Sequence, residues 1–233
     1  MDPVGAAGTR GRISPASLVS FARLGLDLNG ADRPTALAGL HLHWLFELLR
    51  AETVRSSLEV GFGLGISAAA LFHAGVEHHI AIELSDNRLA VAEANVARVR
   101  EAGQRFRLLK GRSDRWLPAL VEEGCAVDLM LVDGGHRFDD VFIDTHYAQF
   151  LVRPGGVLLL DDCGLNGVRA VTSWLDNNLG TTWERLVPPT VLAGQPHFAM
   201  AGYRRLDSRD DARPSGNRPW NRHRRFETFT DQN

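Results

Sequence analysis

The stretch Leu58-Glu59-Val60-Gly61-Phe62-Gly63-Leu64-Gly65-Ile66-Ser67 is the most informative part of this chain. It begins like a short buried strand, continues as a glycine-rich turn, and ends like the start of a helix. Such a turn directs backbone N–H groups and a helix N-terminus toward a ligand, where they hold an anionic group. Glycine is needed because a Cβ would block the turn or the approach of the ligand. The spacing E-x-G-x-G-x-G-x-S differs from the dinucleotide fingerprint G-x-G-x-x-G, which requires glycine at the position of Ile66.

The composition is that of a globular protein. The 233 residues are 44% hydrophobic and 23% charged, which is ordinary for one α/β domain. A net charge of -2 gives no reason to expect a nucleic-acid partner. The chain has no apolar run near the ~18 residues of a membrane span, and its first residues do not resemble a secretory signal. Two cysteines are too few for a disulfide scaffold. We therefore expect a cytoplasmic protein without a membrane partner.

Strand and helix patterns alternate along most of the chain. We expect strands at 57–60, 79–84, 105–110, 127–132 and 157–160, with closing strands at 183–187 and 198–204. Helices are expected at 35–51, 67–74, 86–101, 114–123, 138–151 and 165–179, with Asp86 as the cap of the 86–101 helix. This alternation predicts an α/β fold, with a mostly parallel sheet covered by helices on both faces.

The two ends of the chain have a different composition. Residues 1–34 are expected to form a flexible or helical N-terminal extension, and residues 35–205 the main domain. Residues 206–233 contain many arginines among Pro, Ser, Gly and Asn, and we expect a basic, flexible tail. A role of this tail as a flap, a partner arm or an anion-binding segment remains an alternative. His41 and His43, in the 35–51 helix, are interpreted as packing or surface histidines because they point in different directions.

Polar and acidic residues recur where the expected strands end. In parallel sheets ligands bind beyond these carboxyl ends. The residues concerned are Glu59 with the glycines Gly61 and Gly63, Glu83, Ser113, Asp133 to His136, and the pair Asp161-Asp162.

Three of these residues are carboxylates at the ends of two strands that should be neighbours. Asp133, Asp161 and Asp162 would repel one another unless a cation lay among them, and Mg²⁺ prefers such oxygen ligands. Alternatively, the pair caps the next helix or faces solvent, and Asp133 contacts only a cofactor. His136 follows two glycines that allow it to turn back toward the strand end, and its reference pKa of about 6.5 suits a base. The alternative for His136 is a residue that only begins a helix.

These motifs together resemble the class I S-adenosylmethionine (SAM) dependent O-methyltransferases that use a divalent metal, especially the catechol-type enzymes and the sugar methyltransferases of antibiotic pathways. The similarity extends from about Leu37 to Arg204. It implies a Rossmann-like class I methyltransferase fold with a seven-stranded sheet.

The resemblance also implies a role for each motif. Residues 58–67 correspond to motif I, Glu83 to the acid that binds the ribose, and Ser113 to the adenine segment. Glu59, Gly61, Gly63, Ser67 and Asp133 would complete the cofactor site. Asp133, Asp161 and Asp162 would hold Mg²⁺ or another divalent metal, and His136 would be the catalytic base.

Two departures argue against a catechol substrate. The catechol type has Asp-Asn where this chain has Asp161-Asp162, and Lys where it has His136. We therefore expect methyl transfer from SAM to a hydroxyl of a small molecule such as a sugar, polyphenol or natural product, with a homodimer possible. The alternatives are a non-catalytic SAM-binding module, a metal-independent methyltransferase, and a nicotinamide oxidoreductase.

Overall fold

The computed structural model describes residue 26 and residues 39–180, 182–190, 192–193 and 199–206. Its strands form one seven-stranded sheet in the order β3-β2-β1-β4-β5-β7-β6. The strands are β1 (Ser56–Val60), β2 (His78–Glu83), β3 (Arg105–Lys110), β4 (Val127–Val132), β5 (Val152–Leu160), β6 (Trp183–Arg185) and β7 (Ala201–Arg205). Strands β1 to β5 pair in parallel, and β7 runs antiparallel to both β5 and β6. The predicted α/β fold, with a seven-stranded, mostly parallel sheet, is confirmed.

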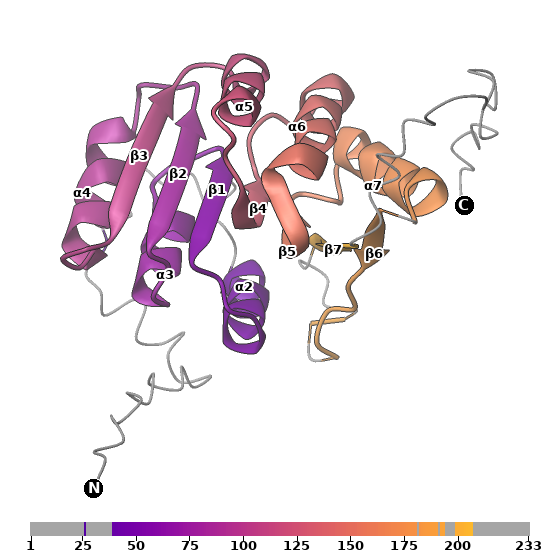
Figure 1. Ribbon diagram of the computed structural model, residues 1–233, viewed down its shortest axis with the longest axis horizontal. Helices are drawn as coiled ribbons and strands as arrows, with labels where there is room; N and C mark the ends of the chain where they lie inside the picture. The colour runs from indigo at the N-terminus through magenta and orange to yellow at the C-terminus, as the bar shows by residue number, and fades with distance from the viewer. Residues whose placement is uncertain (1–25, 27–38, 181, 191, 194–198, 207–233) are drawn as a thin grey trace, which may run out of the picture.

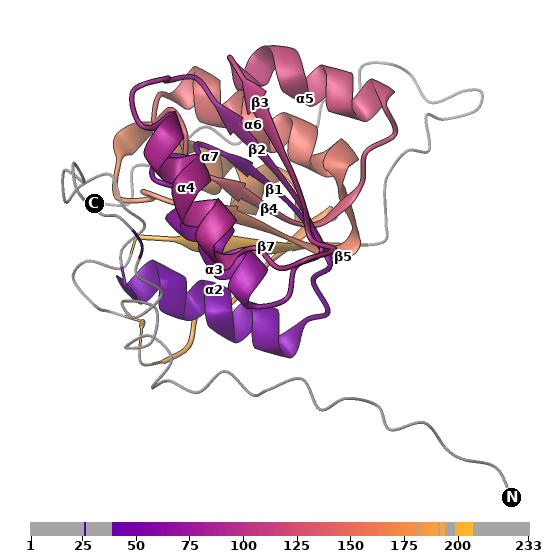
Figure 2. The ribbon, with the colours of Figure 1, turned by 90° about the vertical axis from the view of Figure 1, so that its left-hand side faces the viewer.

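Helices cover both faces of this sheet (Figures 1 and 2). One face carries α2 (Gly39–Ala51), α3 (Ile66–His73) and α4 (Leu89–Val99), and the other carries α5 (Ser113–Glu122), α6 (Phe138–Leu151) and α7 (Asn166–Asn178). The apolar side chains of a strand alternate between these faces. In β4, Leu129 and Leu131 pack in the cluster that contains α2 and α3, whereas Met130 and Val132 pack in the cluster that contains α5 to α7. This two-sided burial explains why β4 consists of buried residues throughout.

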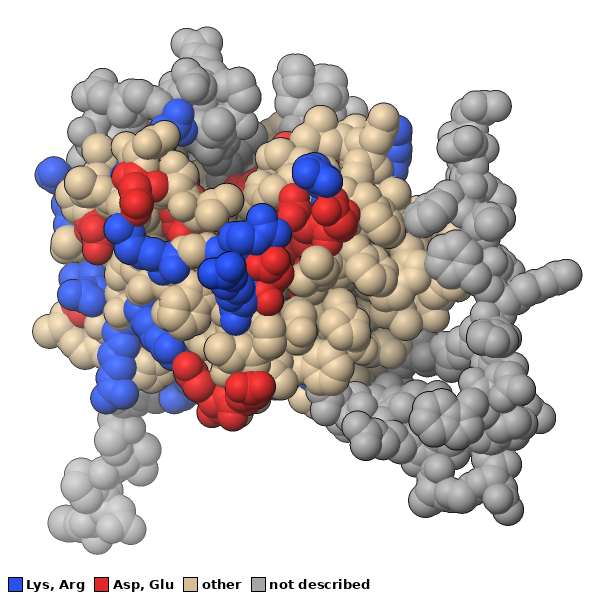
Figure 3. Space-filling view, turned by 90° about the horizontal axis from the view of Figure 1, so that it is seen from above, with Lys and Arg blue, Asp and Glu red and all other residues tan. Residues whose placement is uncertain are grey.

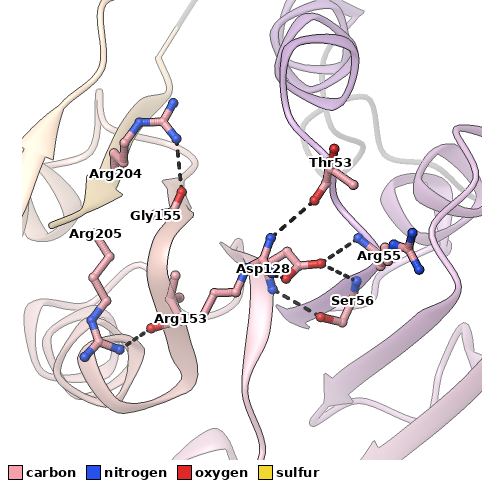
Figure 4. Close-up of polar contacts among 9 residues, drawn as sticks. Thr53, Arg55, Ser56, Asp128, Arg153, Gly155, Arg204 and Arg205 are labelled. Atoms are coloured by element: carbon pink, nitrogen blue, oxygen red, sulfur yellow. Dashed lines mark hydrogen bonds and ion pairs between the residues drawn. The ribbon is translucent and has the colours of Figure 1, made fainter. Parts of the chain in front are cut away.

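A buried aspartate joins the central strands at their amino ends (Figure 4). Asp128, at the start of β4, accepts hydrogen bonds from the backbone N–H groups of Arg55 and Ser56 at 2.6 and 2.9 Å. The Nε atom of Arg153 lies 2.6 Å from its other carboxylate oxygen. Charge-assisted bonds of this kind are stronger than neutral ones. The amino edge therefore has its own polar connection, on the side opposite the expected ligand edge.

Two boundary predictions were wrong. Asp86 does not cap α4, which begins at Leu89 with Arg88 as its N-cap. The Asp86 carboxylate instead lies 2.6 Å from Lys110 Nζ. Strand β5 begins at Val152 rather than at residue 157. Pro154 and two glycines obscured its start, where the pairing with β4 shifts register.

The predictions for residues 1–34 and 206–233 lie outside the described residues, apart from Leu26 and Leu206. Within the part of the chain that is described, none of the helices has the length and apolar character needed to cross a membrane.

Candidate active site

The carboxyl ends of the parallel strands border a cavity of about 760 Å³, called here the strand-end cavity. Figure 3 shows the molecule from the side toward which β1, β2 and β3 point, and acidic and basic side chains are interspersed there. The cavity is lined by the turn after β1 and by residues at the ends of the four remaining parallel strands. These are Glu83, Gly111 to Ser113, Asp133 to His136, and Asp161 with Asp162. The topology thus brings the predicted strand-end segments to one place.

The turn after β1 fits against the end of β4 only because residue 61 is glycine. Gly61 has φ +92°, and a Cβ at this position would lie 2.1 Å from the backbone oxygen of Asp133. Its N–H donates to the Ile82 carbonyl at 2.9 Å, which ties the turn to β2 as well. The left-handed φ and the close backbone both exclude a side chain.

Glu83 holds this turn from the end of β2. Its Oε2 accepts hydrogen bonds from the N–H groups of Phe62 at 2.9 Å and Gly63 at 3.1 Å, and its Oε1 accepts from Ser85 N–H at 2.6 Å. The carboxylate also lines the strand-end cavity. Glu83 therefore shapes the glycine turn in addition to facing the cavity.

Glu59 is buried next to the strand-end cavity and is linked to it through Ser67. Its side chain is fully buried, and it is not among the residues that line the cavity. Its Oε2 accepts a hydrogen bond from the Ser67 hydroxyl, and its Oε1 lies 3.2 Å from Nε2 of His79. His79 Nδ1 lies 2.8 Å from the hydroxyl of Ser57. This buried network fixes Ser67, which does line the cavity.

The acid cluster, defined as Asp133, Asp161 and Asp162, lies at the ends of β4 and β5. Asp133 N–H donates to the Val60 carbonyl at 2.8 Å and Asp161 N–H to the Val132 carbonyl at 3.0 Å, so consecutive strand ends are tied together. Burial, followed by the charges of Asp161 and Asp162, raises the pKa of Asp133 to about 9. Burial and the charge of Asp161 also raise the pKa of Asp162. The cluster therefore has a strong affinity for positive charge, whether a proton or a cation.

The acid cluster contains the donor atoms of the predicted metal site but not its geometry. Three carboxylates are a suitable donor set for a hard divalent cation. Among the residues that the structure describes, however, no group of three or more His, Cys, Asp or Glu side chains is placed to hold a metal ion. Asp162 has φ 55°, an uncommon conformation that aspartate tolerates better than most residues. The charge of the acid cluster fits a cation, and its present geometry does not form a coordination site.

His136 lies at the rim of the strand-end cavity. Its side chain is 42% exposed, and Nε2 lies 3.4 Å from Oδ2 of Asp162. The loop before α6 packs closely on α7, since a Cβ at Gly167 would lie 2.3 Å from the His136 carbonyl oxygen. The structure thus holds an accessible imidazole beside a carboxylate.

His41 reaches the acid cluster from α2. Its Nδ1 lies 2.8 Å from Oδ1 of Asp161, and its Nε2 accepts a hydrogen bond from Ala199 N–H at 3.1 Å. The residue is only 5% exposed and it lines the strand-end cavity. Its interpretation as a packing or surface histidine was incomplete, because it overlooked this polar contact.

Ser113 begins α5 and lines the strand-end cavity. Asp144 of α6 is buried, and burial raises its pKa to about 7 against a smaller opposing effect of Ser113. Sequence reasoning did not single out Asp144, which lies within a helix pattern and not at a strand end.

A comparison with protein families identifies the central part of the chain. Residues 58–163 match the family described as a methyltransferase domain. This segment, residues 58–163, is called here the methyltransferase domain. The match begins at the glycine-rich segment and ends just after the acid cluster, so it spans most of the strand-end cavity.

Solved structures share the fold of this methyltransferase domain. The O-methyltransferase TomG from Streptomyces achromogenes, involved in tomaymycin synthesis and solved with SAM, is 21% identical, with a TM-score of 0.58 over 83% of this chain and 91% of that one. A methyltransferase from Podospora anserina with bound SAH is 17% identical, with a TM-score of 0.63 over 83% and 89%. An O-methyltransferase from Bacillus cereus in complex with SAH is 17% identical, with a TM-score of 0.57 over 83% and 93%. Among curated proteins, no match to the chain is found.

All of the predicted site residues of the methyltransferase domain line the strand-end cavity, with the exception of Glu59. The cavity brings together Gly61, Gly63, Ser67, Glu83, Ser113, Asp133, His136, Asp161 and Asp162. Their roles toward a cofactor, a metal or a substrate remain predictions.

Proposed function

We propose that this methyltransferase domain transfers the methyl group of SAM to a hydroxyl oxygen of a small molecule. The observation that carries the proposal is the strand-end cavity, in which the glycine turn, Glu83 and Ser113 lie at the same edge as His136. Several structural neighbours bound SAM or SAH, and some are named O-methyltransferases, which supports the same donor and acceptor atom here.

The proposed cofactor contacts follow from the lining residues. Glu83 would accept a hydrogen bond from the ribose, Ser113 would meet the adenine, and the turn at Gly61 and Gly63 with Ser67 would hold the amino-acid end. Glu59 would position Ser67 from below, since the two side chains are hydrogen-bonded. Bound SAM supplies an electrophilic methyl group on a sulfonium.

The proposed chemistry is a direct displacement. The acceptor O–C bond forms while the S–C bond breaks, and the hydroxyl proton passes to His136. In a neutral ring that carries its proton on Nε2, the atom 3.4 Å from Oδ2 of Asp162, Nδ1 of His136 would accept this proton. The Asp162 carboxylate then stabilises the imidazolium. Alignment of two bound reactants can lower a barrier by roughly 7–11 kcal/mol, and a positioned base contributes about 10²–10⁴-fold.

A divalent cation is a separate part of the proposal. Asp133, Asp161 and Asp162 would hold it, and bound metal would lower the pKa of an acceptor hydroxyl. The charge of the acid cluster supports this, whereas its geometry does not form a coordination site. A homodimer and a cytoplasmic location, both expected from the sequence, belong to the proposal as well. Light scattering of the purified protein tests the dimer.

Transfer from methyl-labelled SAM to a panel of polyphenols and glycosides tests the proposal, with Mg²⁺ in one arm and a chelator in the other. We expect a labelled ether product and stoichiometric SAH. Full activity in the chelator would exclude the metal and leave a metal-independent methyltransferase. Isothermal titration covers two further alternatives: binding of NADH in place of SAM would identify an oxidoreductase, and SAM binding without turnover on any acceptor would favour a binding module.

A further inference from the structure

His41 connects three parts of the fold that are distant in sequence. It belongs to α2, it contacts Asp161 at the end of β5, and it receives the N–H of Ala199 just before β7. The side chain is 5% exposed, so little water is available to compete for these contacts. A buried side chain that accepts a hydrogen bond at one ring nitrogen and has a carboxylate oxygen 2.8 Å from the other is expected to be held in a single orientation.

The two contacts determine which ring nitrogen carries the proton. Ala199 N–H donates to Nε2, so Nε2 must present its lone pair. In a neutral ring the proton is then on Nδ1, the atom that lies 2.8 Å from Oδ1 of Asp161. The structure therefore assigns the Nδ1–H tautomer to His41.

The Asp161 carboxylate is consequently oriented from two directions. Its Oδ1 lies near His41 Nδ1 and also accepts the N–H of Asp162 at 2.7 Å. Oδ2 receives neither of these contacts, and Asp161 lines the strand-end cavity. The same short segment carries Asp162, which lies 3.4 Å from the proposed base His136. A change in the orientation of Asp161 would therefore act on the segment that contacts the proposed base.

We propose that His41 is a positioning residue for methyl transfer: its Nδ1–H holds the Asp161 carboxylate, and its Nε2 holds the chain entering β7 against α2. This inference rests on the proposed function for its catalytic consequence. Its structural part, which consists of the tautomer and the two contacts, does not depend on methyl transfer.

Two isosteric variants separate the two contacts. In His41→Asn the amide nitrogen takes the place of Nδ1 and keeps the donor to Asp161, but nothing replaces Nε2. In His41→Gln the amide oxygen takes the place of Nε2 and keeps the acceptor for Ala199, but nothing replaces Nδ1. His41→Phe keeps the ring and removes both contacts. His43→Asn is the matched control, because His43 is half-buried on the same helix and is not among the residues that line the strand-end cavity.

The structural readouts are nitrogen NMR of the full chain and amide hydrogen exchange. The imidazole signal that disappears in His41→Phe should show protonated Nδ1 and unprotonated Nε2. The Ala199 amide should exchange about tenfold faster or more in His41→Asn and His41→Phe than in His41→Gln. An Nε2–H tautomer, or equal exchange in the Asn and Gln variants, would overturn the inference.

The catalytic readout uses the acceptor found with the panel. We expect kcat to fall about tenfold or more in His41→Gln and His41→Phe, with Asn and the His43 control near wild type and SAH binding unchanged. Retained kcat in Gln and Phe would refute the positioning role. Should the panel give no product at all, the proposed function fails, while the tautomer and the exchange rates still decide the structural part.

Discussion

At the scale of single residues, Gly61 is the position where the turn and the end of β4 depend on each other. A side chain at position 61 would be strained by the left-handed φ and would clash with the Asp133 carbonyl oxygen. Gly75 also has a left-handed φ, +95°, but no atom lies within 4 Å of an added Cβ. The two glycines therefore share the conformational requirement and differ in the space around them.

We predict that Gly61→Ala lowers the free energy of unfolding by about 2–5 kcal/mol, since backbone strain and overpacking add. Gly75→Ala should cost about 1–2 kcal/mol from the conformation alone. Urea unfolding followed by circular dichroism measures both. Equal losses in the two variants would show that the Asp133 carbonyl is not the constraint.

His136 is the residue on which the proposed base chemistry depends. We predict that His136→Ala lowers kcat by about 10²–10⁴-fold and leaves the SAM dissociation constant unchanged, because the ring acts on the acceptor proton. His146→Ala, an exposed histidine of α6, serves as the control and should turn over normally. Near-normal turnover of His136→Ala would assign the base to another group.

The cavity residues that the sequence predicted lie at or shortly after strand ends, whereas His41, whose contact with Asp161 the sequence did not predict, lies on a helix. Glu83 is the last residue of β2, and Asp133 and Asp161 directly follow β4 and β5. Parallel topology alone brings such strand ends together. His41 lies within a helix, and its contact with Asp161 depends on how α2 packs on the sheet. No local pattern encodes that packing, so the sequence predicted the acids and His136 but not His41, the histidine that contacts Asp161.

At the scale of elements, helices α5 and α6 enclose a carboxyl group that is costly to ionise. Asp144 is 1% exposed, and its pKa is raised to about 7 by burial. Between about pH 4 and pH 7 the unfolded chain has lost a proton that the folded chain still binds. The contribution of Asp144 to stability therefore falls as the pH rises through this window.

We predict that Asp144→Asn removes this pH dependence and is about 1–3 kcal/mol more stable than wild type at pH 8. Urea unfolding at pH 5, 6, 7 and 8 measures the difference between the two proteins. Asp133 titrates in the same direction in both proteins and cancels in that difference. Asp139→Asn, at an exposed position of α6, should show no such trend. A difference that does not change with pH would contradict the expected ionisation of Asp144.

Element boundaries were predictable where one chemical signal dominated. The apolar run of β4 was predicted at its observed bounds because a strand buried on both faces leaves a continuous pattern. The start of β5 was missed because Pro154 and two glycines are typical of a turn, yet in the structure they belong to the strand. The start of α4 was misplaced because Asp86 is a typical capping residue, yet α4 begins three residues later, and Asp86 pairs with Lys110 at the end of β3.

At the scale of the whole molecule, the polar contacts of Asp128 and the strand-end cavity lie at opposite edges of one sheet. Asp128 and its partners connect the amino ends of the strands, and the strand-end cavity lies at the carboxyl ends. A ligand that binds the native fold alone should stabilise the entire domain.

We predict that SAM at about one hundred times its dissociation constant stabilises the protein by about 2.7 kcal/mol, which corresponds to a rise in melting temperature of about 5–10 °C for a domain of this size. NADH at the same concentration should give no shift. Differential scanning fluorimetry measures both. Gly61→Ala should lose the SAM response, and a response to NADH would contradict the proposed donor.

The three hydrogen bonds already accepted by Glu83 affect how any substitution of it must be interpreted. A carboxylate offers about four acceptor positions, and the amides of Phe62, Gly63 and Ser85 occupy three. A ribose with two hydroxyl donors would find one free acceptor position on the carboxylate. The second hydroxyl would have to displace a hydrogen bond that shapes the glycine turn. In the proposed complex, nucleoside affinity and the conformation of the glycine turn would thereby be coupled through a single side chain. Weaker binding in a Glu83 variant would accordingly report a reshaped loop as much as a lost sugar contact.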